Sequence, residues 1–146
     1  MDCVNEVKLQ IESRSVNEGY ARVAVSAFAA ALDPTVEELN DIKTAVSEAV
    51  TNCIVHAYPD TVGKIYITIK ISSDAVMRIT VRDRGCGIAD VKQAREPLFT
   101  TLGGDRAGLG FSVMESFCDR VQVRSVPGRG TTVTLQKRIC GKGGTA

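Results

Sequence analysis

Apolar and polar residues alternate along several segments of the chain, which is typical of strands with one buried face. The alternation is clearest in residues 7–11, 65–71 and 77–81. A Ser-Ser-Asp turn at residues 72–74 joins the last two segments, and this predicts an antiparallel hairpin. A second hairpin is predicted near the C-terminus, where Pro-Gly-Arg-Gly at residues 127–130 separates two further alternating segments.

Apolar residues spaced three and four apart predict a helix after the first strand. Ser15 or Asn17 can cap its start, because both side chains carry an oxygen that accepts a hydrogen bond from the first helical amides. Pro34 is expected to end it, since proline has no amide donor. The apolar stripe that we expect to be buried contains Tyr20, Val23, Ala24, Ala27, Phe28 and Ala31.

A second helix is predicted directly afterwards. Thr35 and Glu38 have the spacing of a capping box, which satisfies two amides at a helix start. We expect this helix to end near His56, before the next proline. Its predicted buried residues are Val36, Leu39, Ile42, Val46, Ala49, Val50 and Cys53.

The predicted order of elements is β-α-α-β-β-(α)-α-β-β, in which the helix in parentheses is a short one around residues 90–95 and the next helix lies at 109–119. Hairpin-connected strands give a mostly antiparallel sheet, and the three longer helices must cover one of its faces. We therefore predict an α/β (α+β) two-layer sandwich. Residues 1–139 are expected to form a single domain, and residues 140–146, which are rich in glycine, a flexible tail.

The amino-acid composition argues against two classes of function, nucleic-acid binding and membrane insertion. The chain has 146 residues, with 18 Lys and Arg against 17 Asp and Glu, so its net charge is only +1. That balance argues against direct nucleic-acid binding, which usually needs a basic excess. No apolar run approaches the ~20 residues of a membrane helix, and the N-terminus lacks a signal-peptide layout. We expect a cytoplasmic protein without membrane contact, whose five cysteines are free thiols.

Two polar residues on the second predicted helix are candidates for chemistry. Glu48 and Asn52 are four residues apart, which places them about 40° apart around the helix axis and beside its apolar stripe. A carboxylate and a carboxamide at the wall of a cleft can accept a proton and supply an oxygen to Mg²⁺. Taken alone, the pair is better explained by a polar helix flank with one side-chain hydrogen bond.

Two glycine-rich loops offer further candidates. Asp83 leaves a strand and is followed by Gly85 and Gly87, so its carboxylate can accept a hydrogen bond from an exocyclic amine while the glycines admit a planar ring. Gly108 and Gly110 open a helix, whose free amides can hold an anion. Each loop alone also fits a plain turn. The chain lacks both the P-loop and the dinucleotide-binding pattern.

The order of these motifs, completed by Gly-Thr-Thr at residues 130–132, resembles the N, G1, G2 and G3 boxes of the GHKL ATP-binding superfamily. The strings SEAVTN (47–52), PLFTT (97–101) and GLGFSVME (108–115) are similar to one branch in particular. That branch is the anti-sigma factors and serine-protein kinases of sporulation, the stage II AB type, which act on sigma F. The resemblance covers nearly the whole chain and implies the Bergerat ATP-binding fold.

The resemblance also implies roles for individual residues. Asn52 would ligate the Mg²⁺ that bridges the ATP phosphates, and Glu48 would act as the catalytic base. Asp83 would bind the adenine amino group, with residues 100–107 forming a lid over the nucleotide. The implied nucleotide-binding set is Asn52, Asp83, Gly85, Gly87, Thr100, Thr101, Gly108, Leu109, Gly110 and Thr132.

By the same resemblance, the protein would be a homodimer that binds a sigma factor of the sigma F type. It would use Mg-ATP to phosphorylate a serine of an anti-anti-sigma factor. Arg22 on the first helix is the candidate partner contact, although a solvated surface explains this residue better. A general-stress sigma regulator of the same branch and a nucleotide-gated binding module without kinase activity are the alternatives. A detached histidine-kinase ATPase domain fits less well, because His56 lies within the N-box helix.

Overall fold

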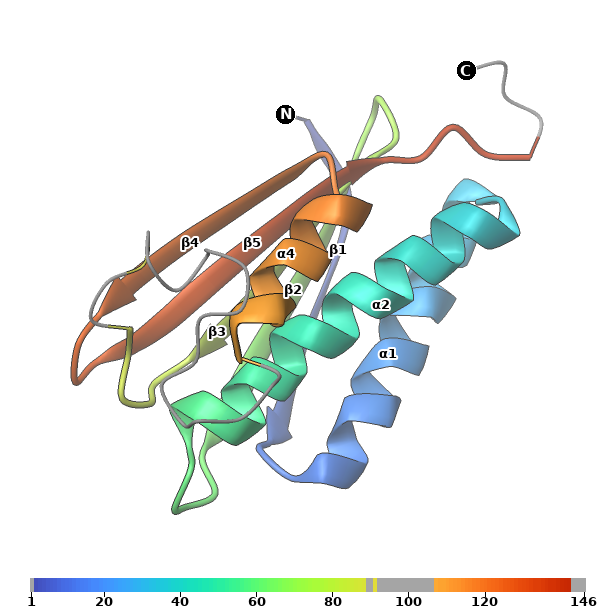
Figure 1. Ribbon diagram of the computed structural model, residues 1–146. Coiled ribbons are helices and arrows are strands. Elements are labelled where there is room, and N and C mark those ends of the chain that lie inside the picture. The colour runs from blue at the N-terminus through green and yellow to red at the C-terminus, as the bar shows by residue number, and fades with distance from the viewer. Residues whose placement is uncertain (1, 89–90, 92–106, 143–146) are drawn as a thin grey trace.

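The computed structural model describes residues 2–88, 91 and 107–142, and all structural statements refer to these (Figure 1). A single sheet and three α-helices make up the described part of the chain. The strands are β1 (Cys3–Glu12), β2 (Lys64–Ser72), β3 (Val76–Asp83), β4 (Arg120–Val126) and β5 (Gly130–Arg138). The α-helices are α1 (Ser15–Ala29), α2 (Val36–Asn52) and α4 (Ala107–Phe117).

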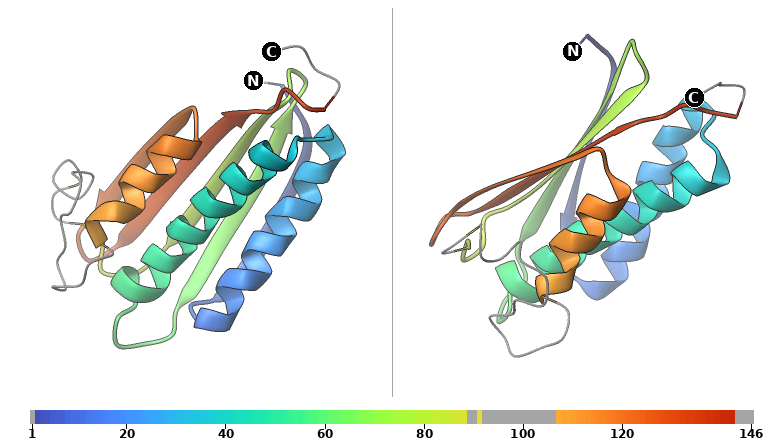
Figure 2. Two further views of the ribbon diagram at one scale, coloured as in Figure 1. Left: turned by 45° about the vertical axis from the view of Figure 1, so that its right-hand side comes forward. Right: turned by 45° about the horizontal axis from the view of Figure 1, so that its top comes forward.

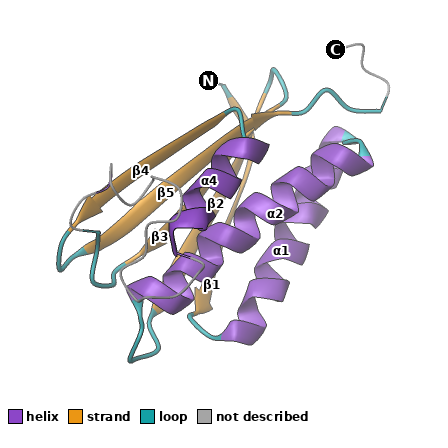
Figure 3. Cartoon of the chain, viewed as in Figure 1, coloured by secondary structure: helices purple, strands orange, loops and turns teal. Residues whose placement is uncertain are grey.

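The sheet has the order β1-β2-β3-β5-β4, and every neighbouring pair is antiparallel. All three helices lie on one side of it, and the other side is uncovered (Figures 2 and 3). The predicted two-layer sandwich is thereby confirmed. The expected short helix at 90–95 and the expected lid at 100–107 lie almost entirely outside the described residues.

The core lies between the sheet and the helices. The four isoleucines of β2, at 65, 67, 69 and 71, are at most 3% exposed and face the helical layer. Alternate residues of the same strand, such as Thr68 and Lys70, line a shallow hollow on the uncovered side. Burial by alternate positions is what the period of two predicted. No helix in the described ranges is long and apolar enough to cross a bilayer.

The buried face of α1 is rotated from the one predicted. Ala21, Val25 and Ala29 are fully buried, whereas Tyr20 and Val23 are more than half exposed. Small residues four apart let α1 approach the neighbouring elements closely, and this decides the face more than the size of the apolar side chains does. Val36 was also predicted to be buried and is 71% exposed, because it is the first residue of α2.

Both ends of α1 differ in detail from the prediction. Neither Ser15 nor Asn17 caps the helix; its N-cap is Arg14, which makes no side-chain cap bond. The side-chain Nδ2 of Asn17 instead donates to the Glu12 carbonyl oxygen at 2.9 Å. At the other end, the chain continues as a short 3-10 turn and stops at Asp33, which has a positive φ of 49°. The helical segment formed by α1 and this turn therefore ends before Pro34, as predicted.

The capping box of α2 is present. The Thr35 hydroxyl accepts from the Glu38 amide at 3.0 Å, and the Glu38 carboxylate accepts from the Thr35 amide at 2.9 Å. The same carboxylate also accepts from the backbone amides of Cys140 and Gly141, at 2.7 and 3.0 Å. Residues 140 and 141, which we expected to belong to a flexible tail, are therefore attached to the start of α2.

Candidate functional site

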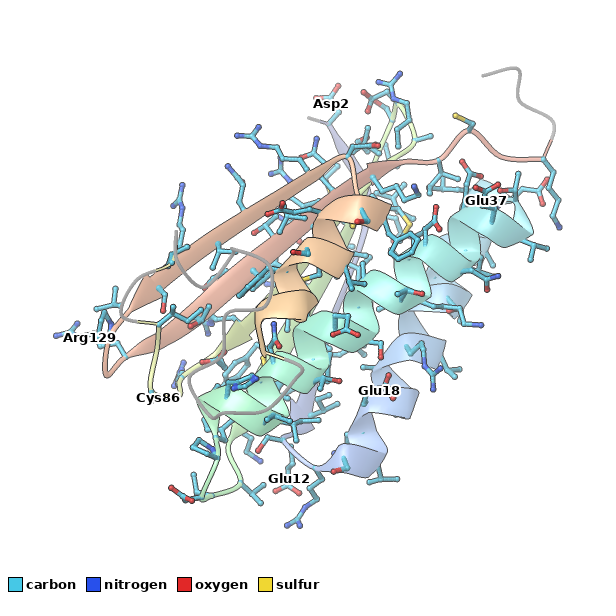
Figure 4. The ribbon with its side chains drawn as sticks, in the orientation of Figure 1. Asp2, Glu12, Glu18, Glu37, Cys86 and Arg129 are labelled. Atoms are coloured by element: carbon cyan, nitrogen blue, oxygen red, sulfur yellow. The ribbon has the colours of Figure 1, made fainter. Side chains whose placement is uncertain are left out.

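Four segments that carry the sequence motifs are brought together at one end of the sandwich. α2 continues past Asn52 as a π-helical turn, Cys53–Ala57, which ends beside the loop that follows β3. In that loop the Cys86 amide donates to the Ala57 carbonyl at 3.2 Å, and the Cys86 thiol donates to the His56 carbonyl at 3.1 Å. Figure 4 shows Cys86 at this end of the molecule. The helix that carries the N-box (α2 with its π-helical turn) and the loop that carries the G1 box (residues 83–87) thus form one packed unit.

Asp83 lies at the centre of this unit. Its side chain is only 5% exposed at the end of β3. Oδ1 accepts from the amides of Gly85 at 2.9 Å and Thr131 at 3.2 Å, and Oδ2 accepts from the Cys53 thiol at 3.5 Å. Burial raises the pKa of this carboxyl group, and the three hydrogen bonds oppose that rise. Asp83 is therefore a fixed, desolvated acceptor.

Two glycines let the backbone close tightly around Asp83. A Cβ on Gly130 would stand 2.2 Å from the Asp83 carbonyl oxygen, and this residue has a φ of +132°. A Cβ on Gly85 would stand 2.2 Å from the Ala57 carbonyl oxygen. Since such contacts are impossible for a side-chain carbon, both positions require glycine.

Gly87 takes part in the same loop through its backbone conformation. Its φ is +75°, and a Cβ there would lie 2.4 Å from the carbonyl oxygen of Val126. The Gly128 amide donates to the Cys86 carbonyl at 2.7 Å and ties this loop to the β4–β5 turn. Gly85 and Gly87 therefore hold the G1 loop in place.

Asn52 packs against the first turn of α4. A Cβ on Gly110 would lie 3.1 Å from Oδ1 and 3.2 Å from Nδ2 of the Asn52 carboxamide. The absence of a side chain at Gly110 thus leaves the carboxamide room beside the N-terminal turn of α4. Free amides in such a turn favour an anion. A metal-ligating carboxamide and a phosphate cradle would be adjacent here, and this arrangement fits Mg-ATP.

Glu48 is half-buried on α2, one turn before Asn52. Residues four apart share a helix face, so its carboxylate lies on the same side of α2 as the carboxamide. In the described ranges no group of three His, Cys, Asp or Glu side chains has the geometry of a metal site.

Thr132 was predicted to support the adenine contact, but the structure places it elsewhere. It lies on the uncovered side of the sheet, where with Thr68, Arg124 and other residues it lines a hollow of about 450 Å³. Thr131 is the buried neighbour, and its amide bonds to Asp83. Because successive residues of a strand point to opposite faces, only one of the two threonines can face the helices. We therefore assign the supporting role to Thr131.

Sequence reasoning also missed two residues that support the site. Cys53 was predicted to be no more than part of an apolar stripe, and its contact with Asp83 is described above. Tyr58 is 8% exposed; its hydroxyl donates to the Lys64 carbonyl and accepts from the Arg84 amide, both at 2.7 Å. Both residues lie in or directly after the π-helical turn, which apolar periodicity does not reveal.

Some predicted site residues are not described. Thr100 and Thr101 lie outside the described residues. For Gly108 and Leu109 only the backbone is described, and it forms the first turn of α4. Their proposed contacts with phosphate therefore stay predictions.

The predicted partner residue, Arg22, lies on α1 away from this site. Its Nε is 3.6 Å from the Glu18 carboxylate, and its side chain is 43% exposed. Glu18, labelled in Figure 4, also accepts a hydrogen bond from the Ser47 hydroxyl of α2. Next to this contact, a hollow of about 340 Å³ runs between α1 and α2. Arg22 thus borders a polar groove that belongs partly to the N-box helix.

Comparison with known proteins identifies the family. The sequence profile of the histidine kinase-like ATPase domain matches residues 11–137. The protein called anti-sigma F factor in Geobacillus stearothermophilus is 52% identical over 139 residues, which cover 94% of this chain and 95% of that protein. The chain belongs to the anti-sigma F factor family. Another anti-sigma F factor, from Pasteuria penetrans, is 51% identical over 137 residues, covering 92% and 91% of the two chains.

Solved structures support the fold of this anti-sigma F family member at low sequence identity. A structure of the RsbU and RsbW domains of a Mycobacterium tuberculosis protein matches with a TM-score of 0.69 and 20% identity, covering 93% of this chain and 33% of that longer one. The mycobacterial sensor histidine kinase MprB matches with a TM-score of 0.56 and 14% identity, over 91% and 99% of the chains. The sandwich is thus a histidine kinase-like ATPase fold.

Proposed function

We propose that this chain is a cytoplasmic, homodimeric anti-sigma factor that binds a sigma factor of the sigma F type. It would use Mg-ATP to phosphorylate a serine of its anti-anti-sigma antagonist. Membership of the anti-sigma F family supports the regulatory role, and the histidine kinase-like ATPase domain supports the use of ATP. The observation that carries the nucleotide site is the buried Asp83 carboxylate, held at the edge of the site by three donors.

Asp83 would select adenine. Its Oδ1 is occupied by two backbone amides, and Oδ2 accepts only the weak thiol donor among the described residues. A carboxylate oxygen has two lone pairs, so Oδ2 can also accept a hydrogen bond from the adenine amino group. Guanine carries a carbonyl oxygen at the corresponding ring position. That oxygen would face the carboxylate without a hydrogen, so ATP would be preferred over GTP.

The phosphates would lie at the N-terminal turn of α4, formed by Gly108, Leu109 and Gly110, because the first amides of a helix have no intrahelical partner. Asn52 would supply an oxygen ligand from the adjacent wall, as its position against Gly110 supports. Bound Mg²⁺ would neutralise part of the phosphate charge. Thr100 and Thr101 would contact the nucleotide from the lid.

Glu48 would be the general base. As the substrate serine oxygen forms its bond to the γ-phosphorus, the serine proton would pass to the Glu48 carboxylate. The bond from the γ-phosphorus to the bridging oxygen breaks, and ADP leaves with that oxygen. Such a transfer depends mainly on position and charge neutralisation, so one base, one metal ligand and an amide cradle are sufficient protein groups.

The sigma factor would dock near Arg22. This guanidinium lies beside Glu18, and the adjoining groove is formed by residues of both α1 and α2. Since α2 also carries Glu48 and Asn52, one helix would contribute to both the partner groove and the nucleotide site. Nucleotide binding could in this way influence partner binding.

The test is transfer of labelled phosphate from ATP to candidate anti-anti-sigma proteins. Phosphoserine should form with the unaltered chain and disappear with Glu48→Ala, while calorimetry still detects ATP binding by the variant. Nucleotide-dependent binding of the partner without any phosphoserine would instead establish a binding module. Capture of a general-stress sigma factor in preference to one of the sigma F type would favour the other regulator of this branch.

A further inference from the structure

A thiol connects the metal-binding helix to the acid at the adenine site. Cys53 directly follows Asn52 in the chain and is 4% exposed. Its Sγ lies 3.5 Å from Oδ2 of Asp83, thirty residues away in sequence. Cys53 and Asp83 are 4% and 5% exposed, so the contact between them is largely shielded from water.

The hydrogen bonds of the Asp83 carboxylate are divided unequally. Oδ1 receives two backbone amides, which are rigid parts of the G1 loop and of β5. Oδ2 receives only the Cys53 thiol in the described part of the chain. The thiol is therefore the group that defines where Oδ2 points.

We propose that Cys53 is a positioning residue for adenine recognition, whose thiol orients the Asp83 carboxylate so that Oδ2 can accept the adenine amino group. The inference rests on the proposed role of Asp83 in binding adenine. Cys53 would then influence nucleotide selectivity through Asp83, without contacting the nucleotide. Because Cys53 is the neighbour of Asn52 in the same helical turn, it also links the position of the carboxylate to that of the metal ligand.

The thiol also affects the acidity of the carboxyl group that it contacts. Burial raises the pKa of Asp83, and donation by the thiol lowers it. Removing the donor should therefore make Asp83 take up a proton at a higher pH.

Other titratable and charged groups surround the pair. His56 belongs to the same π-helical turn, and Tyr58 follows that turn with its hydroxyl bonded to the Arg84 amide. On the uncovered side of the sheet, the hollow beside Asp83 is lined by the guanidinium groups of Arg82, Arg84, Arg124 and Arg129. These groups are unchanged in Cys53 variants, so a difference between variants reports on the thiol.

The experiment compares full-length Cys53→Ala, Cys53→Ser and the control Cys118→Ala. Cys118 is a second, partly buried cysteine, and it lies beyond the opposite end of α4. Calorimetry with ATP and with GTP, in the presence of Mg²⁺, gives affinity and selectivity at each pH. We expect Cys53→Ala to reduce the ATP-over-GTP ratio about fivefold, the effect of one weak hydrogen bond to a charged group. Cys53→Ser, which keeps a donor, should restore it, and Cys118→Ala should leave it unchanged.

The pH profile separates positioning from packing. ATP binding requires ionised Asp83, so affinity falls as the pH drops through the pKa of that carboxyl group. In Cys53→Ala this fall should begin at a higher pH, whereas a loss of packing alone would lower affinity equally at every pH. Wild-type selectivity together with a wild-type pH profile in Cys53→Ala would overturn the inference.

Two further measurements keep the outcome decisive. If the Asp83→Asn variant keeps its ATP-over-GTP selectivity, the proposed role of Asp83 in binding adenine is refuted. If the Asp83→Asn variant loses this selectivity and the Cys53→Ala variant keeps it, only the proposed role of Cys53 is refuted. Should Cys53→Ala not fold, the infrared S–H stretch of Cys53 in wild-type protein gives the answer. It should shift when ATP binds and when Asp83 is replaced by Asn, and no shift in either case would refute the proposal.

Discussion

The carboxamide of Asn52 lies against Gly110, and a single added carbon at Gly110 would come within 3.1 Å of its Oδ1. The two residues are far apart in the chain, on α2 and α4, and each carries a different part of the proposed Mg-ATP site. Because of this contact, the position of α4 affects where the carboxamide of Asn52, the proposed metal ligand, lies.

Gly110→Ala should weaken the binding of Mg-ATP. The added methyl group pushes the Asn52 carboxamide away by a few tenths of an ångström, and disturbing a ligand's support typically costs about tenfold to hundredfold in metal affinity. Calorimetry with and without Mg²⁺ measures the loss. Gly19→Ala is the matched control on a helix, because a Cβ there meets only the end of Arg22, at 3.7 Å. Equal effects of the two substitutions would contradict the proposed contact.

Asn52→Ala should abolish the contribution of Mg²⁺ to ATP binding. The methyl side chain offers no oxygen, and the described part of the chain has no cluster of acidic, cysteine or histidine ligands to replace it. ATP affinity in the variant should therefore be the same with Mg²⁺ and with EDTA. A normal response to Mg²⁺ would rule out Asn52 as a ligand.

Asp83→Asn should reduce ATP-over-GTP selectivity and yet leave the apo fold at least as stable as the wild type at pH 7. The folded state raises the pKa of this carboxyl group, mainly by burying it. Such a group contributes stability below its unfolded pKa, and the contribution is lost as the pH rises through its folded pKa.

Urea unfolding of apo wild-type and Asp83→Asn protein across the pH range checks this sign. The stability of the wild type relative to the variant should decrease as the pH rises from about 4, the ordinary range of an aspartate. A relative stability that increases with pH would show that the hydrogen bonds outweigh burial.

Gly130→Ala should destabilise the protein by about 2–4 kcal/mol, because the methyl group would overlap the Asp83 carbonyl and the φ of +132° is unfavourable for alanine. Gly128→Ala is the control in the same turn. Its φ of +80° is also positive, but no atom lies within 4 Å of the added carbon, so a cost of about 1 kcal/mol is expected. Similar losses of unfolding free energy for both would refute the steric argument.

The strands could be predicted from the sequence because burial on one face gives a period of two. The same rule separates the two threonines: Thr131 alternates with Val133 and Leu135, which are buried, and Thr132 does not. Choosing Thr132 from the motif resemblance overrode this pattern. The face of α1 was harder to predict, since the small residues Ala21 and Ala29 carry little apolar area but allow close approach.

The centre of the site was predictable only in part. Asp83, Gly85 and Asn52 belong to recognisable motifs, and the structure brings their segments together. The contact between Cys53 and Asp83 could not be predicted, because it depends on α2 changing to a π-helical turn after Asn52. Local sequence patterns do not specify where a helix widens, as tertiary packing decides it.

The Glu38 carboxylate serves both the start of α2 and the backbone at residues 140 and 141. Shortening the chain at residue 139 would remove two of its donors and loosen the anchorage of the helix on which Glu48 and Asn52 stand. Affinity tags and reporter fusions are therefore better attached after Lys142 than in place of the last seven residues.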